Sequence, residues 1–334
     1  MKKVFIIAEA GINHNGDLAL AKRMIDIAAE SGADAVKFQA FIASRIVTSS
    51  ASKAPYQTKT VGKAISQLDM LKKYEFGRSE FAALKKYCDR KKIMFLAAPF
   101  DTDSLAMLIS QGLEVIKIPS GEITDLPLLR AVGKLGKKII MSTGMADMGE
   151  IKAAMDVLTF AGTARKDITL LHCRTEYPAP FNELDLKAML TMRDVFGVKV
   201  GFSDHTLGLE ASVAAVALGA EVIEKHFTFD KKMKGPDHKA SLDQKELGAL
   251  VRSIRNIEKA IGDGVKRSTR GELLNKSHAR KSIVAAKDIK KNEIFANSNI
   301  TVKRPGTGLS PVAWDTVIGK SAKRDFMKDE QIEL

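Results

Sequence analysis

The chain has 334 residues, 45% of them hydrophobic and 28% charged, so it can bury a large core and still form a small second domain. Its two cysteines, Cys88 and Cys173, lie far apart in sequence and imply no disulfide framework, so a cytoplasmic location is expected. Glu9 interrupts the first apolar run, and no apolar run is long enough to span a bilayer. We therefore expect neither a signal peptide nor a membrane partner.

The formal net charge is +13, but the basic residues are scattered singly and in pairs among acidic ones. A nucleic-acid-binding protein would be expected to concentrate its basic residues in blocks or interleave them with aromatic residues. The pattern instead favours a solvated surface and a pocket for an anionic small molecule.

Short apolar, β-branched runs alternate with amphipathic helical stretches along the first 260 or so residues. The alternation predicts βαβ units with a parallel sheet, and eight units of this length fit a (β/α)8 TIM barrel. Asp17 and Asp101 are placed to cap the helices that follow them. The expected strands are Val4–Ala8, Ala35–Phe38, Ile93–Ala97, Val115–Ile118, Lys138–Met141, Ile168–His172, Val198–Phe202 and Val222–His226.

An open doubly wound sheet is the alternative fold, and it predicts a G-x-G-x-x-G turn after the first strand. The sequence there, Glu9 to Gly16, does not have that spacing. The segment Ile42–Lys63 lacks periodicity and is rich in Ser, Thr, Ala and Lys, which predicts a long loop over the active site.

The pattern changes after Ile261, where a polar, glycine-rich stretch begins. We expect a barrel domain over residues 1–262, a linker over 263–280, and a small, mostly β module over 281–334. A module of that size is marginal alone and should pack on something else.

Two histidines, His205 and His226, end two of the expected strands. Because the carboxyl ends of barrel strands face one mouth, both imidazoles should emerge there side by side, as in a two-histidine metal site. Two satisfied imidazoles that only cap strand ends are the simpler alternative. Glu9, at the first strand end, could complete the coordination or hold a metal-bound water.

Other polar residues share these strand ends, among them Lys37, Lys117, Ser120, Ser142, Ser203 and Glu122. A buried, unpaired lysine is costly, so an anion between Lys37 and Lys117 would neutralise both, although either side chain could instead reach solvent. We expect His172 to be a core residue. Together the parts suit the addition of an anionic enol phosphate to an aldehyde polarised by a metal, with Glu122 moving protons.

The chain resembles the sialic-acid synthase family, which makes nine-carbon 2-keto sugar acids from phosphoenolpyruvate. The resemblance covers essentially the whole sequence, and its end resembles the family's antifreeze-like (SAF) domain. It rests on Ala8-Glu-Ala-Gly-Ile-Asn-His-Asn-Gly16, Val36-Lys-Phe-Gln39, Lys117-Ile-Pro-Ser-Gly-Glu122, Ser142-Thr-Gly-Met145, Tyr177-Pro-Ala-Pro180, Gly201-Phe-Ser-Asp-His-Thr206, Glu224-Lys-His-Phe-Thr228, Gly235-Pro-Asp237 and Val302-Lys-Arg-Pro-Gly306.

The resemblance implies roles for individual residues. His205 and His226 would bind a divalent metal, usually Mn²⁺, with Mg²⁺ or Co²⁺ as alternatives, and Glu9 would position water. Phosphoenolpyruvate would be held by Lys37, Lys117, Ser120, Ser142 and Ser203. The sugar would be surrounded by Gln39, Glu122, Tyr177 and Asp237. Family members are homodimers with exchanged C-terminal domains, so Arg304 would reach the partner's active site.

Three positions depart from the neuraminate-synthase pattern: Ala98 replaces a threonine, Thr175 replaces an asparagine and Phe38 replaces a histidine. Each of the first two changes could remove a phosphoenolpyruvate contact. The run Thr175-Glu-Tyr-Pro-Ala-Pro-Phe181 and the segment Ala54-Pro-Tyr-Gln57 resemble the branch that makes N,N'-diacetyllegionaminate from 2,4-diacetamido-2,4,6-trideoxy-mannose. The alternatives are N-acetylneuraminate synthesis from N-acetylmannosamine and a non-enzymatic carbohydrate-binding protein.

Overall fold

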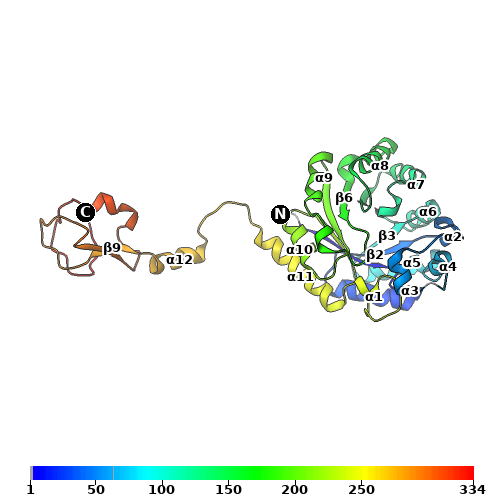
Figure 1. Ribbon diagram of the computed structural model, residues 1–334, viewed down its shortest axis with the longest axis horizontal. Coiled ribbons are helices and arrows are strands. Elements are labelled where there is room, and N and C mark those ends of the chain that lie inside the picture. The colour runs from blue at the N-terminus through cyan, green and yellow to red at the C-terminus, as the bar shows by residue number, and fades with distance from the viewer. Residues whose placement is uncertain (1–2, 63) are drawn as a thin grey trace. The chain divides into compact units, whose positions relative to one another are not determined.

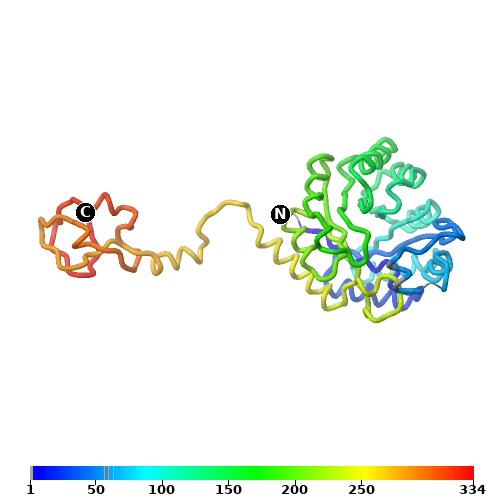
Figure 2. The backbone as a smooth tube through the Cα atoms, in the orientation of Figure 1, coloured from blue at the N-terminus to red at the C-terminus, as the bar shows by residue number. Residues whose placement is uncertain are grey.

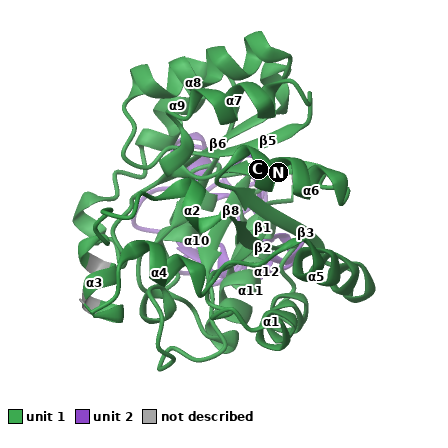
Figure 3. Ribbon diagram, turned by 90° about the vertical axis from the view of Figure 1, so that its right-hand side faces the viewer, with its two compact units in different colours: residues 1–262 green, residues 263–334 purple. Residues whose placement is uncertain are grey.

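The computed structural model describes residues 3–62 and 64–334. Met1, Lys2 and Lys63, which fall at the edges of two segments discussed above, lie outside the described residues. The chain divides into two compact units, Met1–Gly262 and Asp263–Leu334, coloured separately in Figure 3. Each unit is described by itself.

Eight parallel strands form the centre of the first unit, and the fold is a TIM barrel (Figure 1). The hydrogen-bonded order is β3-β2-β1-β8-β7-β6-β5-β4, and β3 lies against β4, which closes the barrel. All eight expected strands are present. Their bounds are β1 Phe5–Gly11, β2 Ala35–Ala40, β3 Met94–Pro99, β4 Val115–Ile118, β5 Lys138–Ser142, β6 Ile168–Cys173, β7 Lys199–Asp204 and β8 Val222–His226.

Helices surround these strands, and the main core lies between the two layers. Both predicted caps are confirmed. Asp17 Oδ1 accepts a hydrogen bond from the Ala19 N–H at 2.7 Å, and Asp101 Oδ1 accepts one from the Ser104 N–H at 2.8 Å. The outer helices are α1 Leu18–Glu30, α5 Arg78–Lys91, α6 Thr102–Ser110, α7 Leu126–Gly133, α8 Met148–Ala161, α9 Ala188–Phe196, α10 Glu210–Ala217 and α11 Gln244–Ala260.

The segment after β2 is not the unstructured loop that its composition predicts. It contains the short helices α2 (Ala43–Ile46) and α3 (Pro55–Val61), and α4 (Gln67–Lys72) follows before α5. Its apolar side chains pack into a separate small core that includes Phe41, Met70 and Leu71. Short helices that each bury only a few side chains leave little periodicity, so the sequence does not reveal them.

The second unit has its own core around Ile283, Phe295 and Phe326. It contains the antiparallel pair β9 (Ser282–Ala285) and β10 (Ile300–Lys303), and the short helix α13 (Trp314–Val317). The segment expected as a linker includes α12 (Arg270–Ala279), which Figure 2 shows at the yellow-to-orange change in the tube. None of the helices in the described part of the chain is long and apolar enough to cross a membrane.

Candidate active site

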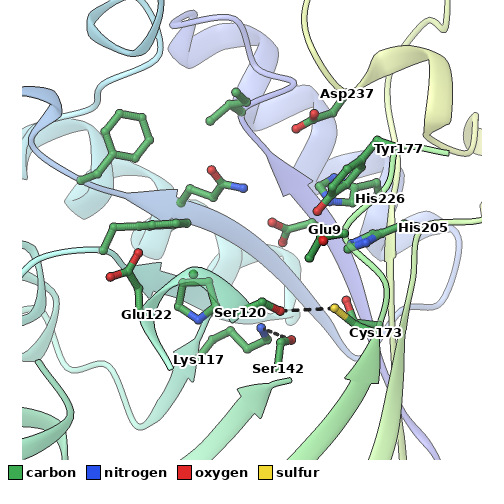
Figure 4. A pocket seen from close by; sticks show the side chains of 18 of the residues that line it. Glu9, Lys117, Ser120, Glu122, Ser142, Cys173, Tyr177, His205, His226 and Asp237 are labelled. Atoms are coloured by element: carbon green, nitrogen blue, oxygen red, sulfur yellow. Dashed lines mark hydrogen bonds between the residues drawn. The ribbon is translucent and has the colours of Figure 1, made fainter. Parts of the chain in front are cut away.

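A cavity of about 330 Å³ opens at the carboxyl ends of the barrel strands. That size suits small-molecule ligands. The segment after β2 contributes Ile46, Val47 and Gln57 to its wall, which confirms that this segment borders the site. Every candidate residue of the first unit lines the cavity: Glu9, Lys37, Gln39, Lys117, Ser120, Glu122, Ser142, Tyr177, Ser203, His205, His226 and Asp237. Figure 4 labels all of these except Lys37, Gln39 and Ser203.

Four ionisable side chains meet at the floor of the cavity. The Lys37 ammonium lies 2.8 Å from Glu224 Oε2 and 3.4 Å from Glu9 Oε2. Lys117 lies 3.7 Å from Glu224 Oε1, so Glu224 contacts both lysines. The strand register produces this cluster, because Glu9 is opposite both Lys37 on β2 and His226 on β8.

The premise that the two lysines are unpaired is therefore wrong, since Glu224 already provides a carboxylate between them. Burial alone would raise the pKa of Glu224, but Lys117 and Lys37 lower it to about 2. Burial raises the pKa of Glu9 to about 8, with Lys37 opposing the rise. At neutral pH the cluster thus contains two ammonium groups and one carboxylate, and it presents net positive charge to a ligand.

Hydroxyl groups surround this positive floor. Lys117 donates to Ser142 Oγ at 2.7 Å, and Ser203 donates to Glu224 Oε1 at 3.0 Å. Ser120 Oγ accepts the N–H of Gly144 at 3.0 Å and lies 3.3 Å from Cys173 Sγ. A Cβ at Gly144 would lie within 3 Å of the Thr175, Cys173 and Ser120 side chains, so any larger residue there would displace these groups. Ammonium groups and hydroxyls in this arrangement suit a phosphate or a carboxylate.

The two histidines are adjacent, as their spacing predicts, with ring centroids 5.4 Å apart. His205 donates from Nδ1 to the Arg174 carbonyl, which leaves Nε2 with a lone pair, and the Tyr177 ring stacks on it at 4.1 Å. Burial lowers the pKa of His205 to about 4 and that of His226 well below its usual value. Both imidazoles are therefore neutral at physiological pH.

Neutral imidazoles are the form that ligates a metal, and a carbonyl on the opposite ring nitrogen is the usual supporting contact. His226 Nδ1 is buried and has no hydrogen-bond partner in the described part of the chain. No group of three or more His, Cys, Asp and Glu side chains that could hold a metal occurs among residues 3–62 and 64–334. The pair thus fits two positions of a metal site whose other ligands would be oxygens of water or substrate.

Two further carboxyl groups face the cavity. Burial raises the pKa of Asp237 to about 7, and its Oδ1 is buried without a hydrogen-bond partner among the described residues. Burial, with help from Asp125 and Asp101, also raises the pKa of Glu122 to about 7. Groups that titrate near neutral pH can give and take protons during a reaction.

The other residues singled out from the sequence occupy different places. Arg304 follows β10 in the second unit and donates to the Ala279 carbonyl at 3.0 Å. Ala98 is buried in β3 opposite Gln39, whereas Thr175 lines the cavity. His172 contacts the Leu184 carbonyl and is buried, as predicted for a core histidine.

Glu224 has no role predicted from the sequence, although its place two residues before His226 puts it on the same face of the strand. The fully buried ion pair between Lys225 and Asp204, 2.8 Å apart, is also not predicted. The register pairs Ser203 with Glu224 and Asp204 with Lys225. Alternation therefore directs the first pair into the cavity and the second to the other side of the sheet.

The barrel is closed and parallel, and its strand ends combine a cationic, hydroxyl-rich floor with two neutral imidazoles. These features define the active site of an enzyme that acts on small anionic substrates. The NeuB family matches residues 24–266, and the SAF domain matches residues 280–333. The chain belongs to the NeuB family.

Two similar curated proteins share a name, N,N'-diacetyllegionaminic acid synthase. The protein from Campylobacter jejuni is 54% identical, over 99% of both chains. The protein from Legionella pneumophila is 43% identical, over 94% of this chain and 89% of its own. Among solved structures, N-acetylneuraminic acid synthetase from Leptospira borgpetersenii has 38% identity and a TM-score of 0.71, covering 82% of this chain and 90% of its own.

Proposed function

We propose that this chain is a nonulosonic acid synthase that condenses phosphoenolpyruvate with 2,4-diacetamido-2,4,6-trideoxy-mannose, forms N,N'-diacetyllegionaminate and releases phosphate. The observation that carries the choice of product is the 54% identity with the C. jejuni synthase over nearly all of both chains. In general terms the reaction is a phosphoenolpyruvate-dependent transfer that forms a carbon–carbon bond.

The positive floor of the cavity supports phosphoenolpyruvate as one substrate. Lys37 and Lys117 would pair with its anionic groups, and Ser120, Ser142 and Ser203 would donate to its oxygens. Glu224 holds the two ammonium groups in place before the substrate arrives, which reduces the reorganisation needed on binding.

His205 and His226, with Glu9 beside them, would hold a divalent metal, Mn²⁺ with Mg²⁺ or Co²⁺ as alternatives. When bound there, the metal would supply Lewis-acid polarisation of the sugar's aldehyde oxygen. Gln39, Tyr177 and Asp237 lie around this part of the cavity and would orient the sugar.

The chain's own carboxyl groups would move the protons. The new bond joins C3 of phosphoenolpyruvate to C1 of the open-chain sugar, and protonated Glu122 would supply the proton that the aldehyde oxygen takes up. Glu9 would orient a water molecule toward C2 and accept its proton once deprotonated. The tetrahedral carbon then loses phosphate and becomes the 2-keto group.

Phosphate release tests the proposal directly. The full chain is incubated with phosphoenolpyruvate, Mn²⁺ and either the diacetamido sugar or N-acetylmannosamine, and phosphate and the 2-keto acid are measured. We expect turnover of the diacetamido sugar. Turnover of N-acetylmannosamine alone would replace the product with N-acetylneuraminate, and no release with any acetamido sugar would refute the synthase.

We also infer a homodimer in which the C-terminal unit of one chain covers the partner's barrel, so that Arg304 contacts the sugar there. The unit's small core, built around Ile283 and Phe326, supports docking on a second surface. We place the reaction in the cytoplasm, because Cys88 and Cys173 are both free thiols.

A further inference from the structure

The walls of the cavity differ in chemical character. The floor and the histidine side are polar and charged, as described above. The wall beside the segment after β2 is apolar; we call it the apolar wall, and it consists of Ile12, Phe41, Ile46, Val47, Leu71 and Phe100. Three of these side chains, Ile46, Val47 and Phe100, are only partly buried.

The residues of the apolar wall belong to the small core formed with α2 and α4. This small core is separate from the main barrel core. Two amides, Gln57 and Gln67, line the cavity from the same segment. This side of the pocket thus combines apolar surface with amide groups. Phe41, Ile46, Val47 and Leu71 come from the segment between β2 and α5, whereas Ile12 follows β1 and Phe100 follows β3.

Phosphoenolpyruvate cannot account for the apolar wall. It carries a phosphate, a carboxylate and a small vinyl group, and its charges match the lysine floor. Partly exposed Val and Ile side chains gain stability when an apolar group covers them. The apolar wall lines the cavity, where the second substrate can provide such a group.

The two candidate sugars differ in the apolar groups they offer. N-Acetylmannosamine has one methyl group, in its acetamido group, and carries a hydroxyl on C6. The diacetamido sugar has three methyl groups: one in each acetamido group and one at C6. An apolar surface that leaves a hydroxyl without a hydrogen-bond partner penalises the first sugar, and the same surface stabilises the second.

We propose that the apolar wall, through Val47 and Leu71, selects the 6-deoxy, diacetamido sugar over N-acetylmannosamine by covering its methyl groups. The inference rests on the proposed synthase function and assigns the residues that choose its sugar. A methyl-sized difference in an apolar pocket changes kcat/KM by about 10-fold or more.

The experiment compares kcat/KM for three sugars at saturating phosphoenolpyruvate and Mn²⁺, using the full chain. The sugars are the diacetamido sugar, N-acetylmannosamine and 2-acetamido-2,6-dideoxy-mannose, which isolates the C6 methyl group. Val47→Thr adds a hydroxyl with little change in shape, and Leu71→Ala removes apolar surface. Leu68→Ala is the matched control, because Leu68 packs in the same small core but does not line the cavity.

We expect Val47→Thr and Leu71→Ala each to lower kcat/KM for the diacetamido sugar about 10-fold, with less than about a 2-fold change for N-acetylmannosamine. In both variants the KM for phosphoenolpyruvate should equal that of the original chain. Leu68→Ala should keep the original chain's preference among the three sugars. Circular dichroism checks that both variants fold. If they do and lower kcat/KM for all three sugars equally, the apolar wall does not select the sugar, while phosphate release still supports the synthase. Absence of release with every sugar would refute both.

Discussion

The Lys37 ammonium and Glu224 Oε2 lie 2.8 Å apart at the floor of the cavity, with only 4% and 6% of their side chains exposed. This pair and the neighbouring Lys117 make Glu224 the residue that keeps two buried positive charges compatible with the fold. Its neutralisation should therefore affect both stability and substrate binding.

We expect Glu224→Gln to lower the free energy of unfolding by about 3 kcal/mol, because it leaves two buried lysines with no fully ionised partner. Urea denaturation measures the loss. Phosphoenolpyruvate should raise the melting temperature of the variant more than that of the original chain, since it replaces the missing negative charge. Glu221→Gln, at a partly exposed position just before β8, is the control and should leave stability unchanged.

Glu122 should produce a pH dependence. Its pKa is raised to about 7, so the proton-donating form is present below that pH and is lost as the pH rises through it. We therefore expect kcat to fall as the pH rises above about 7. Because Glu9 acts only once deprotonated and its pKa is raised to about 8, kcat should also fall as the pH drops below that value, which gives a bell-shaped profile. Glu122→Gln should lower kcat by about 100-fold or more and remove the alkaline limb of the profile. An unchanged profile in the variant would assign the alkaline limb to another group.

The histidine pair can be tested without an activity assay. We expect excess Mn²⁺, at about 100 times its Kd, to stabilise the chain by nearly 3 kcal/mol, measured as a shift in thermal or urea unfolding. His205→Ala and His226→Ala should lose this stabilisation, whereas His278→Ala, at an exposed position in α12, should keep it. Equal stabilisation of all three variants would exclude the metal site.

Arg304 gives a test of the proposed dimer. Arg304→Ala and Lys117→Met chains should each be inactive alone. If Arg304 acts on the partner's barrel, mixed dimers contain one complete site, and subunit exchange should restore about a quarter of the original activity. If Arg304 acts within its own chain, the mixture stays inactive. Sedimentation measures the amount of dimer in each sample.

The arrangement of the barrel could be predicted from the sequence because parallel strands covered by helices are buried on both faces. Such strands are continuous apolar runs, and all eight are visible as such. Their carboxyl ends share one mouth, which is why residues as distant as Glu9 and Ser203 could be expected to lie together. The side-by-side position of His205 and His226 followed from the same rule.

The helices after β2 and the contacts within the floor could not be predicted in this way. Short helices such as α2 and α4 owe their stability to the small core they share, not to a periodic pattern of their own. The position of Glu224 between two lysines depends on the registers of β8 with β1 and of β1 with β2, and on the closure of the barrel that brings β4 near.

The sequence by itself therefore determined which residues lie at the mouth of the barrel, because strand length, alternation and direction are local properties that a parallel fold converts into position. Only the tertiary structure decided which of them pair and which face a ligand. Ion pairs such as Lys37 with Glu224, and the apolar wall of the same cavity, depend on distances of a few ångströms between side chains from different strands and loops. Chain order does not encode those distances.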